Sequence, residues 1–229
     1  MRRLFEIFAA VILSTATLTN IGDIAISSVS EGTAGENFVF NASYPRFFGI
    51  GDSNAQKSLN AQIYEIAQQS LYRTKALSIR LPSGDRPGQS KAEGTFDYEV
   101  KRNSGGIASL LLLETLSCGD SYKSQAKKGF TFYTSSGKIL KISDLFKNSE
   151  EGLGCVNSEI AAQINERGLS KSIQKLKPEV CEDCDFYITD TDLVVIIPEL
   201  TWFSREAGIV EFAIPLKNLN RYLIDILTV

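Results

Sequence analysis

The chain has 229 residues, of which 43% are hydrophobic and 22% charged, and its formal net charge is −3. This composition is that of a globular protein with one large or two smaller cores, and the net negative charge argues against nucleic-acid binding, which needs a basic face. The sequence contains no histidine, which excludes Ser-His-Asp and Cys-His catalysis and every histidine-ligated zinc site.

The N-terminus, MRRLFEIFAAVILSTATLTN, has the order of a secretory signal. Arg2 and Arg3 precede the apolar run Phe5–Leu13, and Ser14-Thr15-Ala16 offers a small-residue cleavage site. Glu6 opposes insertion, and the run is shorter than the roughly 20 residues of a membrane span. We predict that residues 1–22 are a signal peptide, or an N-terminal anchor if uncleaved; the alternative is a buried first helix. The protein is then expected outside the cytoplasm, periplasmic or secreted in a bacterial envelope, and to meet the membrane only through an uncleaved N-terminus.

Residues 23–118 are predicted to form an N-terminal α+β sub-domain. Ser53 is expected to cap a helix that continues to about Leu77, because apolar residues recur there at three- and four-residue spacing. Pro45 is expected to end the strand before it, and residues 81–94 form a loop. The nearly all-apolar run Ile107–Leu116 predicts a central strand covered on both faces. The strands predicted here and just beyond are Ile24–Val29, Phe38–Tyr44, Thr95–Lys101, Ile107–Leu116 and Gly129–Thr134.

Residues 119–229 are predicted to form a C-terminal α+β sub-domain. After a hairpin turn at residues 135–137 we expect a short helix from Ser143, then three alternating strands near the end of the chain. The order of strands and helices is irregular, so we predict an α+β fold with mixed or antiparallel sheets and helices packed on one side. The helices and strands predicted in this part are Cys155–Arg167, Ser170–Leu176, Phe186–Thr189, Leu193–Ile197, Ile209–Ile214 and Lys217–Ile226.

The four cysteines admit three interpretations. In an oxidising compartment they predict two disulfides, either a bridge from Cys118 to Cys155 with a local one from Cys181 to Cys184, or crossed pairings. A redox-active Cys181-x-x-Cys184 is disfavoured because the two acids between the thiols oppose a thiolate. A four-cysteine zinc site is disfavoured because there is one CxxC knuckle and not two. No metal and no other cofactor is predicted.

The segment Pro198–Arg205 is the main candidate for a contact surface. Trp202 is the single tryptophan, and Phe203 and Arg205 follow it. A tryptophan beside an arginine is a common binding hot spot, and sugars stack on such rings; the alternative is that Trp202 fills the core. The same two interpretations, a contact surface or a core position, apply to a second aromatic cluster, Tyr44 and Phe47.

Paired carboxylates could support glycoside cleavage. Glu199, Glu206 and Glu211 lie near the aromatic segment, and a hydrolase would need two such groups facing one cleft. Nothing in the sequence singles out a pair.

Several ordered pieces resemble the extracytoplasmic domain of lysozyme-sensing anti-sigma factors and of proteins with peptidoglycan deacetylase domains. The resemblance covers about residues 36–226 and rests on the order of its pieces. These are Tyr44-Pro45-Arg46-Phe47, a helix with Asn60 and Ile63, Tyr133, Ser136-Gly137-Lys138, Asp144-Leu145-Phe146, a helical pair, Phe186-x-Ile188-Thr189, a strand ending at Pro198, and Ala207–Leu216.

The chain departs from that family at three places. Residues 201–205 replace a tyrosine-rich segment, residues 119–128 lack the histidine of a family loop, and so few residues precede the apolar start that no sigma-binding segment is expected. The resemblance implies a non-enzymatic binding or sensing domain for cell-wall glycan, a lysozyme-like protein or another envelope protein. The alternatives are a carboxylate-based envelope hydrolase and a thiol–disulfide protein.

Overall fold

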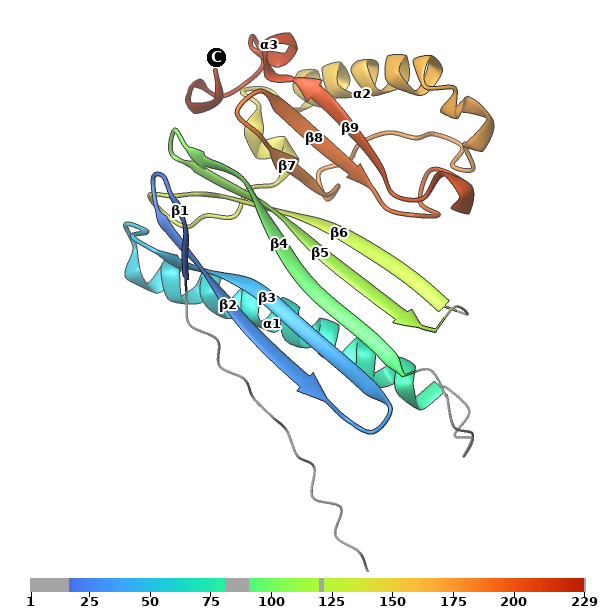
Figure 1. The fold of residues 1–229 in the computed structure, drawn as a ribbon. Helices are drawn as coiled ribbons and strands as arrows, with labels where there is room; N and C mark the ends of the chain where they lie inside the picture. Colours follow the sequence, from blue (N-terminus) through green and yellow to red (C-terminus); the bar gives the residue numbers. More distant parts are fainter. Residues whose placement is uncertain (1–16, 81–90, 120–121, 229) are drawn as a thin grey trace, which may run out of the picture.

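The computed structural model describes residues 17–80, 91–119 and 122–228, and it contains two stacked β-sheets with a helix on each outer face (Figure 1). From one side to the other, the layers are α1, a six-stranded sheet, a three-stranded sheet and α2. The predicted α+β class is confirmed, with each sheet carrying its long helix on one face.

The larger sheet has the strand order β1-β2-β3-β4-β5-β6. All neighbours are antiparallel except β3 and β4, which are parallel and joined by α1, since a parallel pair needs a long crossover. The bounds are β1 Thr17–Ile21, β2 Ala25–Ala34, β3 Phe38–Phe48, α1 Ser53–Arg80, β4 Ala92–Ser104, β5 Ile107–Cys118 and β6 Tyr122–Tyr133.

Helix α1 packs on the larger sheet through its apolar face. Leu59 and Ile63 are buried against Leu110, Leu112 and the phenylalanines of β6. Asp52 caps the helix by accepting the N–H groups of Asn54 and Ala55, one residue before the predicted cap.

The smaller sheet has the order β7-β8-β9 and is antiparallel. Helix α2 covers its outer face, and Asn148 caps this helix by accepting the N–H groups of Glu150 and Glu151. The bounds are η1 Ile142–Leu145, α2 Ser149–Glu166, η2 Leu169–Ser172, β7 Phe186–Ile188, β8 Asp192–Ile197, η3 Arg205–Ala207, β9 Val210–Pro215, α3 Leu216–Leu219 and η4 Asp225–Leu227, where η marks a 3-10 helix.

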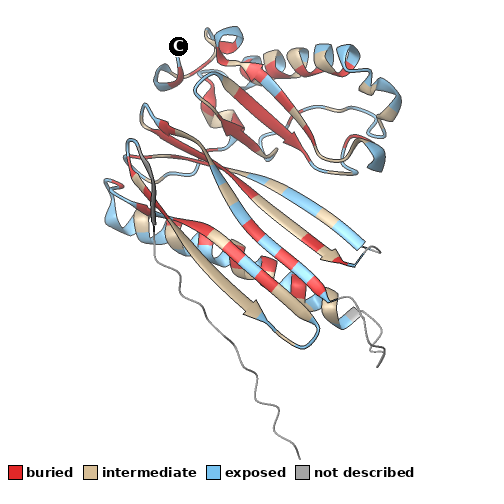
Figure 2. Cartoon of the chain, viewed as in Figure 1, coloured by how far each residue is buried: buried red, intermediate tan, exposed pale blue. Residues whose placement is uncertain are grey.

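Strand β5 lies between the two cores, as its apolar run predicts. Leu110 and Leu112 face α1, whereas Leu111 packs against Tyr187 and Val194 of the smaller sheet. Figure 2 shows the buried residues concentrated in β5 and in the smaller sheet. The two sheets are also joined by a hydrogen bond from the Ile188 N–H to the Ser109 hydroxyl, 2.9 Å long. 

The predicted boundary at residue 118 separates two strands of one sheet. β6 pairs with β5 along nearly its full length, so the chain passes to the second layer after Tyr133. The sequence predicts only the second half of β6, because its first half, YKSQAKK, is polar and largely exposed. Helix α2 likewise begins before the predicted Cys155.

Two further predictions need correction. The predicted helix Lys217–Ile226 is wrong: the helix ends at Leu219, and Leu223 forms a bridge with Phe146 in extended conformation. Pro45 does not end β3, because β4 pairs with β3 only as far as Ala42, and a proline is tolerated where a strand has a free edge.

The predicted signal peptide lies mostly outside the described residues. Its cleavage site at 14–16 lies outside the described residues, whereas residues 17–21 form β1 and pair with β2. Within the part of the chain that the structure describes, no helix has the length and apolar character needed to span a bilayer.

Candidate functional site

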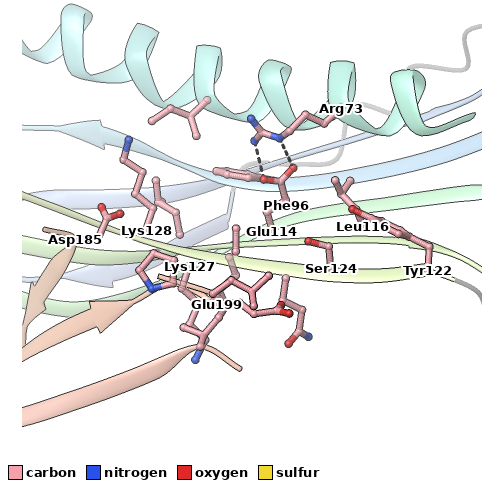
Figure 3. A pocket seen from close by; sticks show the side chains of 18 of the residues that line it. Arg73, Phe96, Glu114, Leu116, Tyr122, Ser124, Lys127, Lys128, Asp185 and Glu199 are labelled. Atoms are coloured by element: carbon pink, nitrogen blue, oxygen red, sulfur yellow. Dashed lines mark hydrogen bonds and ion pairs between the residues drawn. The ribbon is translucent and has the colours of Figure 1, made fainter. Parts of the chain in front are cut away.

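A groove of about 660 Å³ lies along the first half of β6, at the outer edge of the larger sheet. Residues from both layers line it (Figure 3). They are Ile66, Arg73, Phe96, Leu112, Leu113, Glu114, Leu116, Tyr122, Ser124, Gln125, Ala126, Lys127, Lys128, Asp185, Pro198, Glu199, Leu200, Arg205 and Ile209.

The groove lies on both faces of the sheet, because side chains alternate along a strand. Phe130 and Phe132 of β6 pack in the α1 core, so even-numbered residues of this strand face α1. Lys127 reaches Glu211 of β9, so odd-numbered residues face the smaller sheet. Figure 3 shows Arg73 on the α1 side of the strands and Glu199 on the opposite side.

On the α1 side, the wall is built around Glu114. The Arg73 guanidinium donates to both oxygens of this carboxylate, at 2.8 and 2.7 Å, and the buried Ser70 hydroxyl donates at 2.8 Å. Such a bidentate pair fixes both side chains. Lys128 lies on the same side of β6, so this wall carries two positive charges and one negative charge.

The wall on the other side is a strained turn. The Thr201 N–H donates to the Pro198 carbonyl, and Leu200 has φ +62°, where a β-carbon is unfavourable. The Leu200 side chain is 52% exposed in the groove. Glu199 and Arg205 form an ion pair of 3.3 Å beside it.

Lys127 connects the groove to the smaller sheet through Glu211. The carboxylate of Glu211 accepts from Lys127 and from the Tyr187 hydroxyl, the latter at 2.8 Å. Burial alone would raise the pKa of Glu211, but these hydrogen bonds outweigh it and hold the pKa below its usual value. Burial, together with the bond to Glu211, raises the pKa of Tyr187.

Asp185 closes one end of the groove. Burial raises the pKa of this carboxyl, and this is opposed by Lys128 and by a hydrogen bond from the Gly129 N–H. Asp185 therefore lies close to the outward N–H of Gly129, the residue that follows the exposed half of β6.

The predicted aromatic contact surface at Trp202 is not formed. Trp202 and Phe203 are each 1% exposed and pack with Phe212 in the core beneath α2. Their rings are therefore not available for stacking on a sugar, and the alternative that Trp202 fills the core describes its position. Of that cluster, Arg205 is exposed and lines the groove.

The second predicted cluster is also internal. Phe47 is fully buried between Phe130 and Phe132, and Tyr44 is 8% exposed, with its hydroxyl donating to Glu31. The amide of Asn60 bonds both the N–H and the carbonyl of Phe47 at 2.8 and 3.1 Å, so it fixes the end of β3.

The four cysteines lie in three different places. Cys118 is buried at the end of β5, whereas Cys155 is in α2, and the smaller sheet lies between these two elements (Figure 1). The considered bridge from Cys118 to Cys155 is therefore incompatible with the fold. The sulfurs of Cys181 and Cys184 are 3.3 Å apart. Burial raises the pKa of the Cys184 thiol to about 11, which disfavours a reactive thiolate.

The candidate carboxylates do not meet in one cleft. Glu199 lines the groove, Glu211 is bound by Lys127 and Tyr187, and Glu206 is an exposed residue of η3 outside the lining. Among the described residues, no three or more Cys, Asp or Glu side chains gather closely enough to hold a metal ion. The site residues that sequence reasoning missed are Arg73, Glu114, Lys127 and Leu200, because their role depends on pairings across layers.

No family model and no curated protein matches the chain. The solved structures that share its fold include two DUF3298 family proteins. A member of the DUF3298 family from Bacteroides fragilis NCTC 9343 has a TM-score of 0.64 at 12% identity, over 90% of this chain and 96% of that one. A DUF3298 family protein from Pseudomonas aeruginosa PAO1 has a TM-score of 0.59 at 12% identity, with the same two coverages. The chain therefore has the fold of DUF3298 family proteins.

Proposed function

We propose that the protein is a non-enzymatic binding or sensing module that acts outside the cytoplasm and holds a segment of another envelope protein in the groove beside β6. The observation that carries this proposal is the groove itself, with its apolar floor, charged rims and exposed strand edge. Grooves that combine an apolar lining with a few placed polar groups are typical ligand sites.

A protein segment fits the groove better than a glycan does. Sugar sites use exposed aromatic faces, and the predicted candidates Trp202 and Phe203 are buried. Tyr122 is the one tyrosine among the lining residues, and it is 41% exposed. The leucine and isoleucine side chains of the lining suit apolar peptide side chains instead.

A sensing role comparable to that of the extracytoplasmic domains of anti-sigma factors is part of this proposal. It rests on the ordered sequence pieces between residues 36 and 226, with a lysozyme-like protein as one partner to test. The extracytoplasmic location rests on the basic and apolar N-terminus, and cell fractionation with N-terminal sequencing tests it.

The binding proposal is tested by NMR titration of the ¹⁵N-labelled protein with three probes: a native lysozyme, chitotetraose and the peptide acetyl-EVEVEV-amide. We expect the lysozyme or the peptide to shift the amide signals of Leu113, Lys127 and Ile209, and chitotetraose to leave them unchanged. Leu200→Asp should abolish the shifts. Leu176→Asp is the matched control, because Leu176 is fully exposed and lies outside the groove lining. Shifts with none of the probes, or only at other surfaces, would overturn the proposal.

A further inference from the structure

The outer edge of β6 changes character along its length. In a strand, the N–H and C=O groups of one residue point to the same side, and successive residues alternate. The Tyr133 N–H donates to the Lys138 carbonyl, and the Thr131 carbonyl accepts from the Leu140 N–H, so odd-numbered residues point away from β5. Residues 138–140 therefore cover the end of this edge.

The covered part ends at Gly129, which lies against the backbone of Phe186 and close to the Asp185 carboxylate. Before it, the outward groups belong to Lys123, Gln125 and Lys127. Among the residues that the structure describes, no backbone or side-chain group hydrogen-bonds the outward N–H and C=O groups of these three. Three consecutive outward positions thus form an open template for another strand.

The groove surrounds this template on both faces. A strand added to β6 would send alternate side chains toward α1 and toward the smaller sheet, and the groove has a wall on each side. This combination of an open edge with pockets for alternate side chains is the arrangement by which proteins bind extended peptides as an extra strand.

The two walls differ in chemistry. The α1 side presents Arg73 and Lys128 against the single carboxylate of Glu114. The other side presents apolar Leu113, Leu200 and Ile209 around the Glu199–Arg205 pair, whose charges cancel. The first wall complements acidic side chains and the second complements apolar ones.

We propose that an extended peptide binds as a seventh strand on β6, with acidic side chains toward α1 and apolar side chains toward the smaller sheet. This inference rests on the proposed function and names the form in which the groove takes its ligand. Because Asp185 ends the template, about five or six peptide residues can pair. The lysines of β6 also discourage pairing between copies of the chain, whereas an acidic strand neutralises them.

The test measures the affinity of acetyl-EVEVEV-amide and of the same residues in the order acetyl-EEEVVV-amide, which lacks alternation. Gln125→Pro removes one outward N–H, and its ring takes up space on the open edge and not in the β5–β6 ladder. We expect this variant to weaken binding of the alternating peptide by about tenfold or more. Gln125→Ala loses only the side chain and keeps the backbone donor, so strand addition predicts that it weakens binding less than Gln125→Pro does.

A second measurement leaves the protein unchanged. N-methylation of the peptide on its valine nitrogens or on its glutamate nitrogens blocks one edge of the strand at a time. We expect one of these peptides to lose binding and the other to keep it. When the peptide binds, hydrogen exchange should slow at the backbone amides of Lys123, Gln125 and Lys127. It should not change at Ser124 and Ala126, whose N–H groups point toward β5.

Full binding by Gln125→Pro, equal affinity of the two sequence orders, or tolerance of both methylation patterns would overturn strand addition. The proposed function would stand in that case if Leu200→Asp still abolished binding. If lysozyme shifts the amide signals of the groove but neither peptide binds, strand addition is overturned and the proposed function still stands. If none of the probes binds in the groove, both proposals are overturned.

Discussion

The indole of Trp202 packs against the ring of Phe212, with centroids 6.5 Å apart and planes inclined by 35°. Both rings are buried in the core between the smaller sheet and α2. This contact joins the loop after β8 to β9, so the single tryptophan of the chain holds together the end of the smaller sheet.

Trp202→Ala should therefore act on stability. We expect a loss of about 3–5 kcal/mol in the free energy of unfolding, because the substitution leaves a large cavity. Urea denaturation followed by circular dichroism measures it. Arg205→Ala is the matched control from the same segment, and its exposed ion pair predicts a change below about 1 kcal/mol. A normal unfolding curve for Trp202→Ala, combined with lost ligand binding, would contradict the core role.

The Glu114 carboxylate should matter more for stability than the arginine that binds it. Glu114 is 12% exposed and satisfies the buried Ser70 hydroxyl, whereas Arg73 is 47% exposed. We expect Glu114→Ala to cost about 2 kcal/mol, since it leaves a buried donor without a partner, and Arg73→Ala to cost about 0.5–1 kcal/mol. Denaturation of both single variants and the double variant gives the coupling energy. Equal costs for the two single variants would argue against the role of Ser70.

Replacing Leu200 by glycine should change stability and ligand binding in opposite directions. Its left-handed backbone, φ +62°, costs a leucine about 1–2 kcal/mol and a glycine almost nothing. Leu200→Gly should therefore raise the free energy of unfolding by up to about 1 kcal/mol, since half of the lost side chain is already in water.

The same variant should bind the EVEVEV peptide more weakly, because an apolar part of the groove is removed. Thermal unfolding and NMR titration measure the two effects, and Leu176→Gly supplies the exposed-leucine control. A Leu200→Gly protein that is less stable than the wild type would show that the turn is not strained.

Low pH should weaken the contact between β6 and β9 that Glu211 makes with Lys127. The pKa of Glu211 is held below its usual value of 4.5 in the folded protein. A carboxyl with a lowered folded pKa contributes stability that is present above the unfolded pKa and is lost as the pH falls through the folded one. We expect this contribution to disappear below about pH 4.5.

Glu211→Gln should remove this contribution to the pH dependence of the free energy of unfolding. The free energies of unfolding of the variant and the wild type should therefore differ less at low pH than at neutral pH. Denaturation at a series of pH values between neutral and acid measures it. Glu206→Gln, which alters an exposed carboxyl in η3, is the control. If the two variants change the pH profile equally, the Lys127–Glu211–Tyr187 contact does not contribute.

Local pattern was sufficient to predict most of the elements. The apolar run Ile107–Leu116 identified a strand covered on both faces, and three- and four-residue spacing identified α1, because burial of one face leaves a periodic trace in the sequence. The first half of β6 left no such trace, since an edge strand with exposed faces needs no apolar alternation. The prediction of a helix over Lys217–Ile226 was wrong because residues 222–224 pair with residues 145–147. This tertiary contact outweighs the helical spacing of the apolar residues.

The candidate site was harder to predict for the same reason. An aromatic residue close to an arginine in the sequence can lie in a core or on a surface. The burial of Trp202 therefore could not be predicted without knowing that Phe212 and α2 pack against it. The groove residues come from α1, β4, β5, β6, the residue before β7 and the segment between β8 and β9, and only the stacking of the two sheets brings them together.

The pairing of the cysteines is the last prediction. Cys181 and Cys184 are already in contact, with sulfurs 3.3 Å apart, whereas Cys118 and Cys155 belong to different layers. In an oxidising compartment we therefore expect one disulfide, between Cys181 and Cys184, and no bridge from Cys118 to Cys155. Alkylation of protein from the envelope fraction without reduction, followed by peptide mass mapping, should find residues 181 and 184 linked and no peptide that joins residue 118 to residue 155. Cys181→Ser should abolish the link and leave the remaining peptides unchanged. A linked peptide that contains Cys118 and Cys155 would contradict the layered arrangement, and four alkylated cysteines in protein from that fraction would contradict the extracytoplasmic location.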